Sequence, residues 1–366
     1  MNQKKTVLFL ANHFITLYSF RKEMIKRMLD EGHDVILSLP KSDENTYFID
    51  LGCKVIETDI DRRGINPLKD MMLIHQYAKI LKSIRPDIVF SFTIKPNIYG
   101  SLANRQVGYK QVCNITGTGA TFLKNNLMSS ICKMLYKVSV KHCYKVFFQN
   151  TGDRDFFIRH RMVKDNYSMI PGSGCNLEQH AFSELPEGNS LNFIYIGRVM
   201  KLKGIDEYLS CAKYIHNKYP DAHFYIAGWN EEPEYMQKVN EAESDGYIKY
   251  LGFRKDIDEC IKKCHCTILA SYGGEGVPNV LLETAANGRI CIASRINGSR
   301  DVIDEGKTGF LFTPGDSNDL IKQVEYFISL SPEKRNEMGR LGRKKIERDF
   351  DREIVINAYL TELHKS

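Results

Sequence analysis

Short apolar runs alternate with amphipathic stretches along the first half of the chain. Six runs rich in β-branched and aromatic residues have the length of buried strands. They are TVLFLA (6–11), DVILSL (34–39), KVIET (54–58), DIVFSF (87–92), QVCNIT (111–116) and KVFFQ (145–149). Between several of them, residues 20–32 and 68–84 have the spacing of amphipathic helices. This alternation predicts right-handed βαβ units and a parallel sheet.

The same alternation restarts after residues 176–192, a polar and turn-rich stretch that we interpret as a linker. Six further strands are predicted at NFIYIG (192–197), HFYIAG (223–228), YIKYLG (247–252), HCTILA (265–270), RICIAS (289–294) and GFLFT (309–313), with helices from Ser331 onward. We therefore predict an α/β protein of two doubly wound, Rossmann-like domains that face each other across a cleft. The predicted domains are 1–180 and 181–345, and a C-terminal helix, 346–366, is expected to pack back on the first domain.

The length of 366 residues suits two domains, and no apolar run approaches the roughly 20 residues that span a membrane. The start, MNQKKTVLFL, is a short apolar run that we interpret as the first strand. Ten cysteines without disulfide-like spacing suit a reducing cytosol. The segment CIKKCHC (260–266) has no second ligand cluster, so we expect no metal and interpret it as a helix end leading into a strand.

Positive charge is concentrated in the first half of the chain. Residues 1–180 hold 26 Lys and Arg against 16 Asp and Glu, whereas the remainder holds 25 against 29. Between residues 71 and 145 there are 11 basic residues and one acidic residue, Asp87. This asymmetry indicates an anionic partner, which is a membrane lipid, a nucleic acid or a phosphorylated substrate.

One candidate phosphate site follows a predicted strand directly, in GRVMKLKG (197–204). Gly197 ends the strand, and Arg198 and Lys203 flank a short loop before a helix that begins near Gly204 or Asp206. Two cations beside a glycine-bordered turn suit a phosphate, although a solvated basic turn is the alternative. Neither a dinucleotide fingerprint nor a Walker loop is present.

A second candidate site is SYGGEGVPNVLLE (271–283), which follows the strand HCTILA. Pro278 suits the first turn of a helix, so the amides around Val277 to Val280 would form an anion site. Glu275 precedes this helix on a glycine-rich loop, and Glu283 lies more than one turn into it. Each carboxylate can accept two hydroxyls of a sugar ring, whereas an ordinary loop acid and a surface helix residue are the alternatives.

Two segments of the first domain end strands at the same predicted edge. ANHFITLYSF (11–20) supplies Asn12 and His13, and ITGTGATF (115–122) supplies two hydroxyls and two glycines, at Thr116, Gly117, Thr118 and Gly119. Glycines there would let a ligand approach the backbone closely. A lone loop histidine is more often not catalytic, and the second segment is also explained as a plain turn.

A helix predicted at 125–145 carries Lys133, Lys137 and Lys141 at i, i+4 spacing. A basic amphipathic helix can bind an anionic membrane surface. A solvated face is the usual explanation of such a stripe, but the scarcity of acids around it favours the membrane.

Together, GR-x4-KG and E-G-x-P-x4-E resemble the motifs of the retaining glycosyltransferase family four, whose members have the GT-B fold. The resemblance covers essentially the whole chain. The segments ANHFITLYSFRKEM, SFTIKPNIYG, ITGTGATF and IPGSGCN are most similar to bacterial enzymes that build lipid-linked O-antigen, capsular or N-glycan oligosaccharides. These include N-acetylgalactosaminyltransferases that act on undecaprenyl-diphosphate sugars.

The resemblance implies a role for each matching residue. Arg198 and Lys203 would hold the donor diphosphate, and Glu283 the ribose hydroxyls. Glu275, with the backbone of Gly276, Val277, Pro278, Asn279 and Val280, would hold the donor sugar and the β-phosphate. Arg254 lies in the loop that lines the base pocket in the family. The chain departs from the family at Asn12-His13-Phe14, where many members have a Gly-Gly pair, and at 116–119, where many have a histidine.

The resemblance thus implies a retaining hexosyltransferase that uses a UDP-sugar, with UDP-GalNAc as the first candidate, and needs no metal. The implied acceptor is an undecaprenyl-diphosphate-linked sugar, and the implied location is the cytoplasmic face of the plasma membrane. A GT-B sugar-nucleotide epimerase is an alternative. A non-catalytic glycan-binding or nucleic-acid-binding protein is another, although no RNA-binding signature is present, and we expect no nucleic-acid partner.

Overall fold

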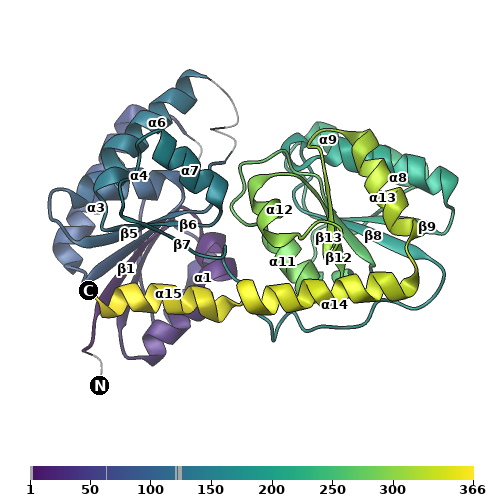
Figure 1. The fold of residues 1–366 in the computed structure, drawn as a ribbon. Helices are drawn as coiled ribbons and strands as arrows, with labels where there is room; N and C mark the ends of the chain where they lie inside the picture. The colour runs from purple at the N-terminus through teal and green to yellow at the C-terminus, as the bar shows by residue number, and fades with distance from the viewer. Residues whose placement is uncertain (1–2, 63, 120–121, 123–125) are drawn as a thin grey trace. The chain divides into compact units, whose positions relative to one another are not determined.

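The computed structural model describes residues 3–62, 64–119, 122 and 126–366. They form two compact units, Met1–Ser173 with Glu353–Ser366, and Gly174–Arg352. Each unit is a parallel β-sheet with helices on both faces (Figure 1). The prediction of an α/β protein with two doubly wound domains is therefore confirmed.

In the first unit, seven parallel strands pair in the order β3-β2-β1-β4-β5-β6-β7. They are β1 (Thr6–Leu10), β2 (Asp34–Leu39), β3 (Lys54–Glu57), β4 (Ile88–Phe92), β5 (Lys110–Ile115), β6 (Lys145–Phe148) and β7 (Tyr167–Met169). The first six match the predicted runs closely. The strand β7 is not predicted by the pattern, because its three residues are too few to show a period.

Two sets of helices cover this sheet, and each set packs on one of its faces (Figure 1). The first set is α1 (Phe14–Asp30), α2 (Thr46–Asp50) and α15 (Arg352–His364), and the second is α3 (Pro67–Ile84), α4 (Ile94–Asn104), α6 (Leu127–Ser139) and α7 (Thr151–Arg159). Among the described residues, this unit also contains two 3-10 turns, η1 (Asp43–Asn45) and η2 (Val140–His142). The start of α3 is fixed locally, because Asn66 caps the helix and a proline occupies its first turn.

The second unit contains six strands in the order β10-β9-β8-β11-β12-β13, again all parallel. They are β8 (Leu191–Ile196), β9 (Ala222–Ala227), β10 (Lys249–Tyr250), β11 (Cys266–Leu269), β12 (Ile290–Ser294) and β13 (Gly309–Phe312). The predicted six-residue strand at 247–252 is reduced to two residues, because only these pair with the edge strand β9. The other five match the sequence pattern closely.

Helices again pack on both faces of this sheet. One face is covered by α8 (Ile205–Lys218), α9 (Pro233–Ser244) and α13 (Ser317–Ser329), and the other by α10 (Ile257–Lys262), α11 (Asn279–Ala286), α12 (Asn297–Val302) and α14 (Pro332–Asp349). A single 3-10 turn, η3 (Lys201–Lys203), precedes α8.

The order of the strands locates the place in each sheet where a ligand is expected. The strand β1 lies between β2 and β4, and β8 lies between β9 and β11, so the connections leave in opposite directions on the two sides. In open parallel sheets, ligands bind beyond the carboxyl ends of the strands at such a switch point. The motif with Arg198 follows β8, and the motif with Glu275 follows β11, so both lie at the switch point of the second unit.

Several predicted boundaries differ from those in the structure. The helix predicted at 20–32 begins at Phe14, because His13 caps it. The helix predicted at 125–145 ends at Ser139 and continues as the 3-10 turn η2. Pro278 is the N-cap of α11 rather than a residue of its first turn.

The two units divide at positions other than the predicted 180/181 and 345/346. Residue Cys175 forms a bridge with Asp351, and its amide donates to the carbonyl of Phe350 at 2.7 Å. These bonds tie the segment after Ser173 to the end of α14, so both belong to the second unit. The last residues, Glu353–Ser366, belong to the first unit, where α15 contributes to the core.

We predict that the first unit depends on Tyr359 of α15. Its buried ring contacts Phe90, Phe92 and Phe147, and its hydroxyl pairs with Asn114. Replacement by alanine leaves a cavity, so Tyr359→Ala should destabilise this unit by about 3–5 kcal/mol in urea unfolding. The matched control is Ile354→Ala on the same helix, whose side chain is exposed. Equal stability of the two variants would contradict this account of the core.

Candidate functional site

Two glycines bring the loops after β8 and β9 together in the second unit. A Cβ atom on Gly228 would lie 1.8 Å from the carbonyl oxygen of Gly197, so only glycine permits this approach. Beyond this contact, the amide of Val199 donates to the carbonyl of Trp229 at 2.9 Å. The backbone around Arg198 is thereby fixed at the carboxyl end of the sheet.

A third glycine places Lys203. Gly204 has a φ of 72°, and a Cβ there would lie 2.1 Å from the carbonyl oxygen of Ala270, just after β11. The turn η3 is therefore held against the end of β11, and the amide of Tyr272 donates to the carbonyl of Leu202 at 3.0 Å. Because of this packing, the two sequence motifs meet.

The contact between the motifs is an ion pair. Nζ of Lys203 lies 2.7 Å from Oε1 of Glu275, and each side chain is about one-fifth exposed. Burial alone would raise the pKa of Glu275, but the charge and hydrogen bond of Lys203 and the charge of Arg198 outweigh it. The pKa of Glu275 is therefore below its ordinary value, and the carboxylate is ionised at neutral pH.

Arg198 lies beside this pair and contacts a further acid. Its guanidinium is 3.6 Å from the carboxylate of Glu231, and its backbone carbonyl accepts the hydroxyl of Tyr195 at 2.7 Å. The side chain of Arg198 is one-third exposed, so it remains accessible to a ligand. Glu231 is not among the residues predicted from the sequence, although its position shortly after β9 is a signal that could have indicated it.

The helix α11 begins beside Glu275. No side chain caps it, and Gly276, Val277 and Pro278 before it are buried, whereas Asn279 and Val280 are half-buried. The first amides of a helix have no intrahelical acceptor, and they carry a partial positive charge. A Cβ on Gly298 would lie 1.7 Å from the carbonyl oxygen of Gly276, which fixes this loop against α12.

Glu283 lies in α11 and is half-buried. Burial raises its pKa, as does the charge of Asp258, while His180 and Arg352 act in the opposite direction. The two carboxylates of this segment thus have opposite pKa shifts, because Glu275 has a lysine partner and Glu283 has none at that distance.

A polar cluster that the sequence motifs do not predict acts on Glu283. Nδ1 of His180 is 2.7 Å from Oδ1 of Asp258, and the side-chain amide of Asn287 donates to the same oxygen at 2.8 Å. No sequence pattern singles out His180, because it stands in the stretch interpreted as a linker. The cluster fixes the segment before β8 against α10 and α11.

The structure does not bring Arg254 into contact with the other predicted donor residues. It lies in the loop after β10, and its guanidinium pairs with Asp256 at 2.5 Å, with both side chains exposed. Its assignment to a base pocket stays a prediction.

In the first unit, Asn12 is buried and His13 caps α1. Nδ1 of His13 accepts the amide hydrogen of Ile15 at 3.1 Å, so the neutral ring carries its proton on Nε2. Burial and the charge of Arg62 lower the pKa of His13, against the effect of Glu44. In this state the ring can donate a hydrogen bond but has no lone pair free to accept a proton, which argues against a general base.

The segment after β5 is half-buried from Thr116 to Gly119. Gly117 and Gly119 have φ values of 117° and 68°, which other residues rarely adopt, so the glycines are needed for this turn. The segment follows the carboxyl end of β5, next to β4 in the sheet. Its role on the acceptor side stays a prediction.

The helix α6 has an exposed apolar stripe beside its lysines. Leu127, Ile131, Met134 and Val138 are all exposed, the first by 78%. Lys137 is exposed, Lys133 lies over the ring of Phe156 at 5.5 Å, and Lys141 falls in the turn η2. Among the described residues, no helix is long and apolar enough to cross a bilayer.

The segment CIKKCHC does not have free ligand atoms at its histidine. Nδ1 of His265 accepts the amide of Asn192 and Nε2 faces the carbonyl of Pro186, both at 3.1 Å. Burial lowers the pKa of His265 to about 4. This supports the interpretation as a helix end and a buried strand.

Elsewhere in the described part of the chain, one group of potential metal ligands comes together, namely Glu31, His33 and His364. However, Nδ1 of His33 accepts the amide of Lys5 at 3.2 Å, so its Nε2 carries the proton and has no lone pair for a metal.

Taken together, the second unit gathers two cations, an ionised carboxylate and a free helix N-terminus at one sheet edge. Such an arrangement can bind a phosphate through Arg198, Lys203 and the amides of α11. It can also bind hydroxyl groups through Glu275 and Glu283. A ligand with both features, a phosphate and a polyol, satisfies all of them.

Comparisons with known proteins agree with this assignment. The family model "Glycosyl transferases group 1" matches residues 177–345, and the model "Glycosyl transferase 4-like" matches residues 6–150. The first covers both motifs of the site. Together they cover most of the chain.

One relative is the N,N'-diacetylbacillosaminyl-diphospho-undecaprenol alpha-1,3-N-acetylgalactosaminyltransferase of Campylobacter jejuni, 26% identical over 96% of each chain. Another is the UDP-Gal:alpha-D-GlcNAc-diphosphoundecaprenol alpha-1,3-galactosyltransferase of Escherichia coli, 27% identical over 88% of this chain and 86% of that protein.

Among solved structures, Anabaena Alr3699/HepE in complex with UDP has the same fold. Its TM-score is 0.79 at 16% identity, and the match covers 98% of this chain and 99% of that one. With two family models, curated relatives along nearly the whole chain and the GT-B architecture in agreement, the chain belongs to the group 1, GT4-like glycosyltransferases and is a hexosyltransferase.

Proposed function

We propose that the protein transfers a hexose or N-acetylhexosamine from a UDP-sugar to a polyprenyl-diphosphate-linked glycan, with retention at the anomeric carbon. The observation that carries the donor side is the 2.7 Å contact of Lys203 with Glu275, which joins the two motifs at the switch point of the second sheet. The names of the Campylobacter and Escherichia relatives, both of which act on diphospho-undecaprenol sugars, support the acceptor class. N-acetylgalactosamine is the first candidate for the transferred sugar.

In this proposal, the diphosphate of the donor binds between Arg198, Lys203 and the first amides of α11. As the bond from the sugar to the β-phosphate breaks, negative charge grows on the departing UDP. Cations and amides that are already in place stabilise this charge most strongly in the transition state, where stabilisation raises the rate. The resident charges can do this without a metal ion.

The two glutamates have separate roles on the donor. Glu275 is ionised and is oriented by Lys203, so it accepts hydroxyls of the transferred sugar beside the phosphate. Glu283 lies just over one turn into α11 and accepts the ribose hydroxyls. Neither is placed as a nucleophile here, so we propose attack by the acceptor on the face that UDP leaves, with a phosphate oxygen taking the proton.

The acceptor side is assigned to the first unit. The helices α3 and α6 both begin after carboxyl ends of strands, and their first two turns expose Leu68, Met71, Met72 and Leu127. Exposed apolar groups of this size beside lysines suit the interface of an anionic bilayer. We therefore propose peripheral attachment at the cytoplasmic face of the plasma membrane, in the synthesis of a surface polysaccharide or glycan.

Loss of the charge at Arg198 is predicted to remove most of the activity. Transfer from UDP-GalNAc to a short polyprenyl-diphosphate sugar should fall at least about a hundredfold in Arg198→Ala, because one donor to the developing charge is missing. Arg348→Ala is the matched control, since that arginine is exposed on α14 and pairs only with its neighbour Asp349. Undiminished transfer by Arg198→Ala would contradict the proposed phosphate contact. A new sugar nucleotide formed without acceptor would instead support an epimerase.

The two glutamates are predicted to affect stability in opposite directions. The pKa of Glu283 is raised, so its ionised form opposes folding, and Glu283→Gln should raise the melting temperature at pH 7. This gain should shrink as the pH falls through the raised pKa, where Glu283 of the wild type becomes protonated. The pKa of Glu275 is lowered, so its charge stabilises the fold above its unfolded pKa, and Glu275→Gln should lower the melting temperature at pH 7.

At Glu283, the affinity for UDP and the stability of the fold are predicted to change in opposite directions. The Glu283→Gln variant should bind UDP about tenfold more weakly by calorimetry, because ribose hydroxyls lose a charged acceptor. Tighter or unchanged binding would remove Glu283 from the ribose site.

Attachment to anionic vesicles is predicted to need both the lysines and the apolar stripe of α6. Replacing Lys133, Lys137 and Lys141 by glutamine should reduce co-sedimentation with anionic vesicles severalfold and make the remainder insensitive to salt. The control replaces three exposed lysines of the second unit, Lys249, Lys322 and Lys344. Equal pelleting of wild type with neutral and anionic vesicles would overturn the basic surface as the anchor.

A further inference from the structure

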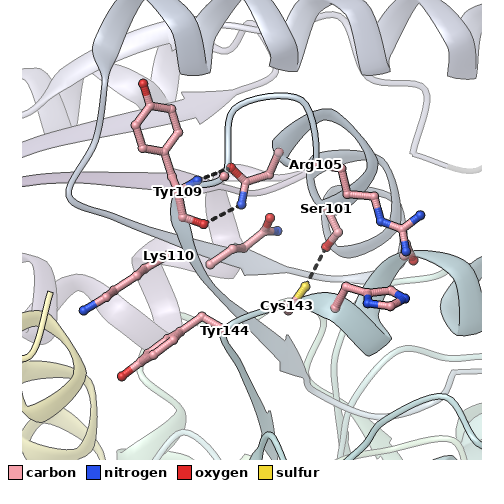
Figure 2. A pocket seen from close by; sticks show the side chains of 11 residues that line it. Ser101, Arg105, Tyr109, Lys110, Cys143 and Tyr144 are labelled. Atoms are coloured by element: carbon pink, nitrogen blue, oxygen red, sulfur yellow. Dashed lines mark hydrogen bonds between the residues drawn. The ribbon is translucent and has the colours of Figure 1, made fainter.

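A separate pocket of about 270 Å³ opens in the first unit, away from the predicted acceptor residues. It lies at the amino ends of β5 and β6, between the last turn of α4 and the turn η2, and its wall includes Ser101, Arg105, Lys110 and Cys143 (Figure 2). The segment 116–119 follows the opposite end of β5, about 17 Å along the strand at 3.3 Å per residue. No part of the glycosyl-transfer proposal uses this pocket.

The rim of the pocket is strongly positive. Arg105 ends α4, and His142 lies in η2. Burial lowers the pKa of His142, and the charges of Arg105, Lys164 and Lys141 act in the same direction. Within the described part of the chain, none of these three cations forms an ion pair. Arg105 lines the pocket beside His142, and unpaired positive charge at a concave site attracts an anion.

The acid that acts on Tyr144, a residue of the pocket wall, is already paired with lysines. Glu362 of α15 acts on Tyr144, but it also pairs with Lys145 at 3.5 Å and with Lys365 at 3.3 Å. Lys110 points the same way as Tyr144 in Figure 2, and its Nζ donates to the backbone carbonyl of Lys365. The positive charge near Arg105 and His142 is therefore not balanced from this side.

The wall of the pocket contains a buried oxygen without a donor. Gln111 is 1% exposed, and its side-chain oxygen has no hydrogen-bond partner. Its orientation is fixed by a chain of bonds. The amide of Asn97 donates to the carbonyl of Asn114 at 2.8 Å, so its oxygen must be the acceptor for the hydroxyl of Ser91, also at 2.8 Å.

The single hydroxyl proton of Ser91 is thereby used. Its oxygen is left as the acceptor for the Gln111 amide, at 3.0 Å. The side-chain amide of Gln111 therefore has one orientation, because exchanging its oxygen and nitrogen would break the hydrogen bond to Ser91. Gln111 belongs to the pocket wall, and its buried side-chain oxygen is left as an acceptor without a donor.

We propose that this pocket binds the phosphate group of a small molecule, with Arg105 and His142 contacting the anionic oxygens and Gln111 accepting a hydroxyl of the same ligand. Inorganic phosphate and a sugar phosphate both carry an anionic oxygen together with a hydroxyl. The volume is at the lower end for small-molecule sites, which are roughly 300 Å³ or larger, so a nucleotide-sugar or a lipid-linked glycan does not fit. This site does not depend on the proposed glycosyl transfer.

The test uses the full chain labelled with ¹³C in its histidine rings, in a reducing agent because Sγ of Cys113 and of Cys143 are only 3.1 Å apart. The resonance of His142, assigned with His142→Gln, reports this pocket directly, whereas that of His180 reports the second unit. Titration with inorganic phosphate up to roughly 20 mM should shift the His142 resonance saturably. The absence of a saturable shift would overturn the proposal.

Two variants distinguish specific binding in the pocket from attraction by the net charge of the unit. Arg105→Gln should weaken phosphate binding at least tenfold. Lys82→Gln removes the same charge from an exposed position at the end of α3 and should leave the affinity within twofold. Equal weakening by both variants would show that only the net charge of the unit attracts phosphate, and it would overturn the assignment.

A separate titration with sulfate tests the role of Gln111. Sulfate has the shape and charge of phosphate but carries no proton at neutral pH, so it cannot donate to the Gln111 oxygen. Sulfate should therefore bind at least tenfold more weakly than phosphate, and equal affinities would overturn this contact. A titration with glucose 1-phosphate shows which molecule carries the bound phosphate group. Tighter binding than that of inorganic phosphate indicates that the ligand is a sugar ester. Weaker binding indicates that the ligand is free phosphate.

Discussion

The ion pair between Lys203 and Glu275 is the interaction on which the site depends, because it joins two motifs 72 residues apart. Its geometry is fixed by backbone packing, since no side chain is tolerated at Gly204, where the turn touches the end of β11. The pair keeps Glu275 ionised in a half-buried place, and it holds the ammonium group beside Arg198. A phosphate that enters finds its cations already in position, which is what electrostatic preorganisation requires.

Most of the fold follows from the sequence because both sheets consist of parallel strands buried on two faces. Such strands are continuous apolar runs, and their ends are marked by glycine, so eleven of thirteen were located closely. The exceptions are β7 and β10, which have three and two residues. Their positions depend on pairing with a neighbour, which local pattern does not encode.

The site was partly predictable for a related reason. Arg198 and Glu275 stand in short motifs directly after strands, where a parallel sheet presents its ligand sites. The cluster of His180, Asp258 and Asn287 could not be found in this way, since its three members come from a loop, α10 and the end of α11. Likewise, Gln111 has the appearance of an ordinary strand residue, and its unpaired oxygen is visible only when the bonds of Ser91 and Asn97 are followed.

The placement of α15 has a consequence for how the chain folds during synthesis. Tyr359, Leu360 and Leu363 complete the core of the first unit, although they are separated from it by the whole second unit. The ribosome makes the second unit before it delivers this helix. The first unit therefore emerges from the ribosome with one face of its sheet partly uncovered. This apolar face stays accessible to chaperones until the last residues are synthesised.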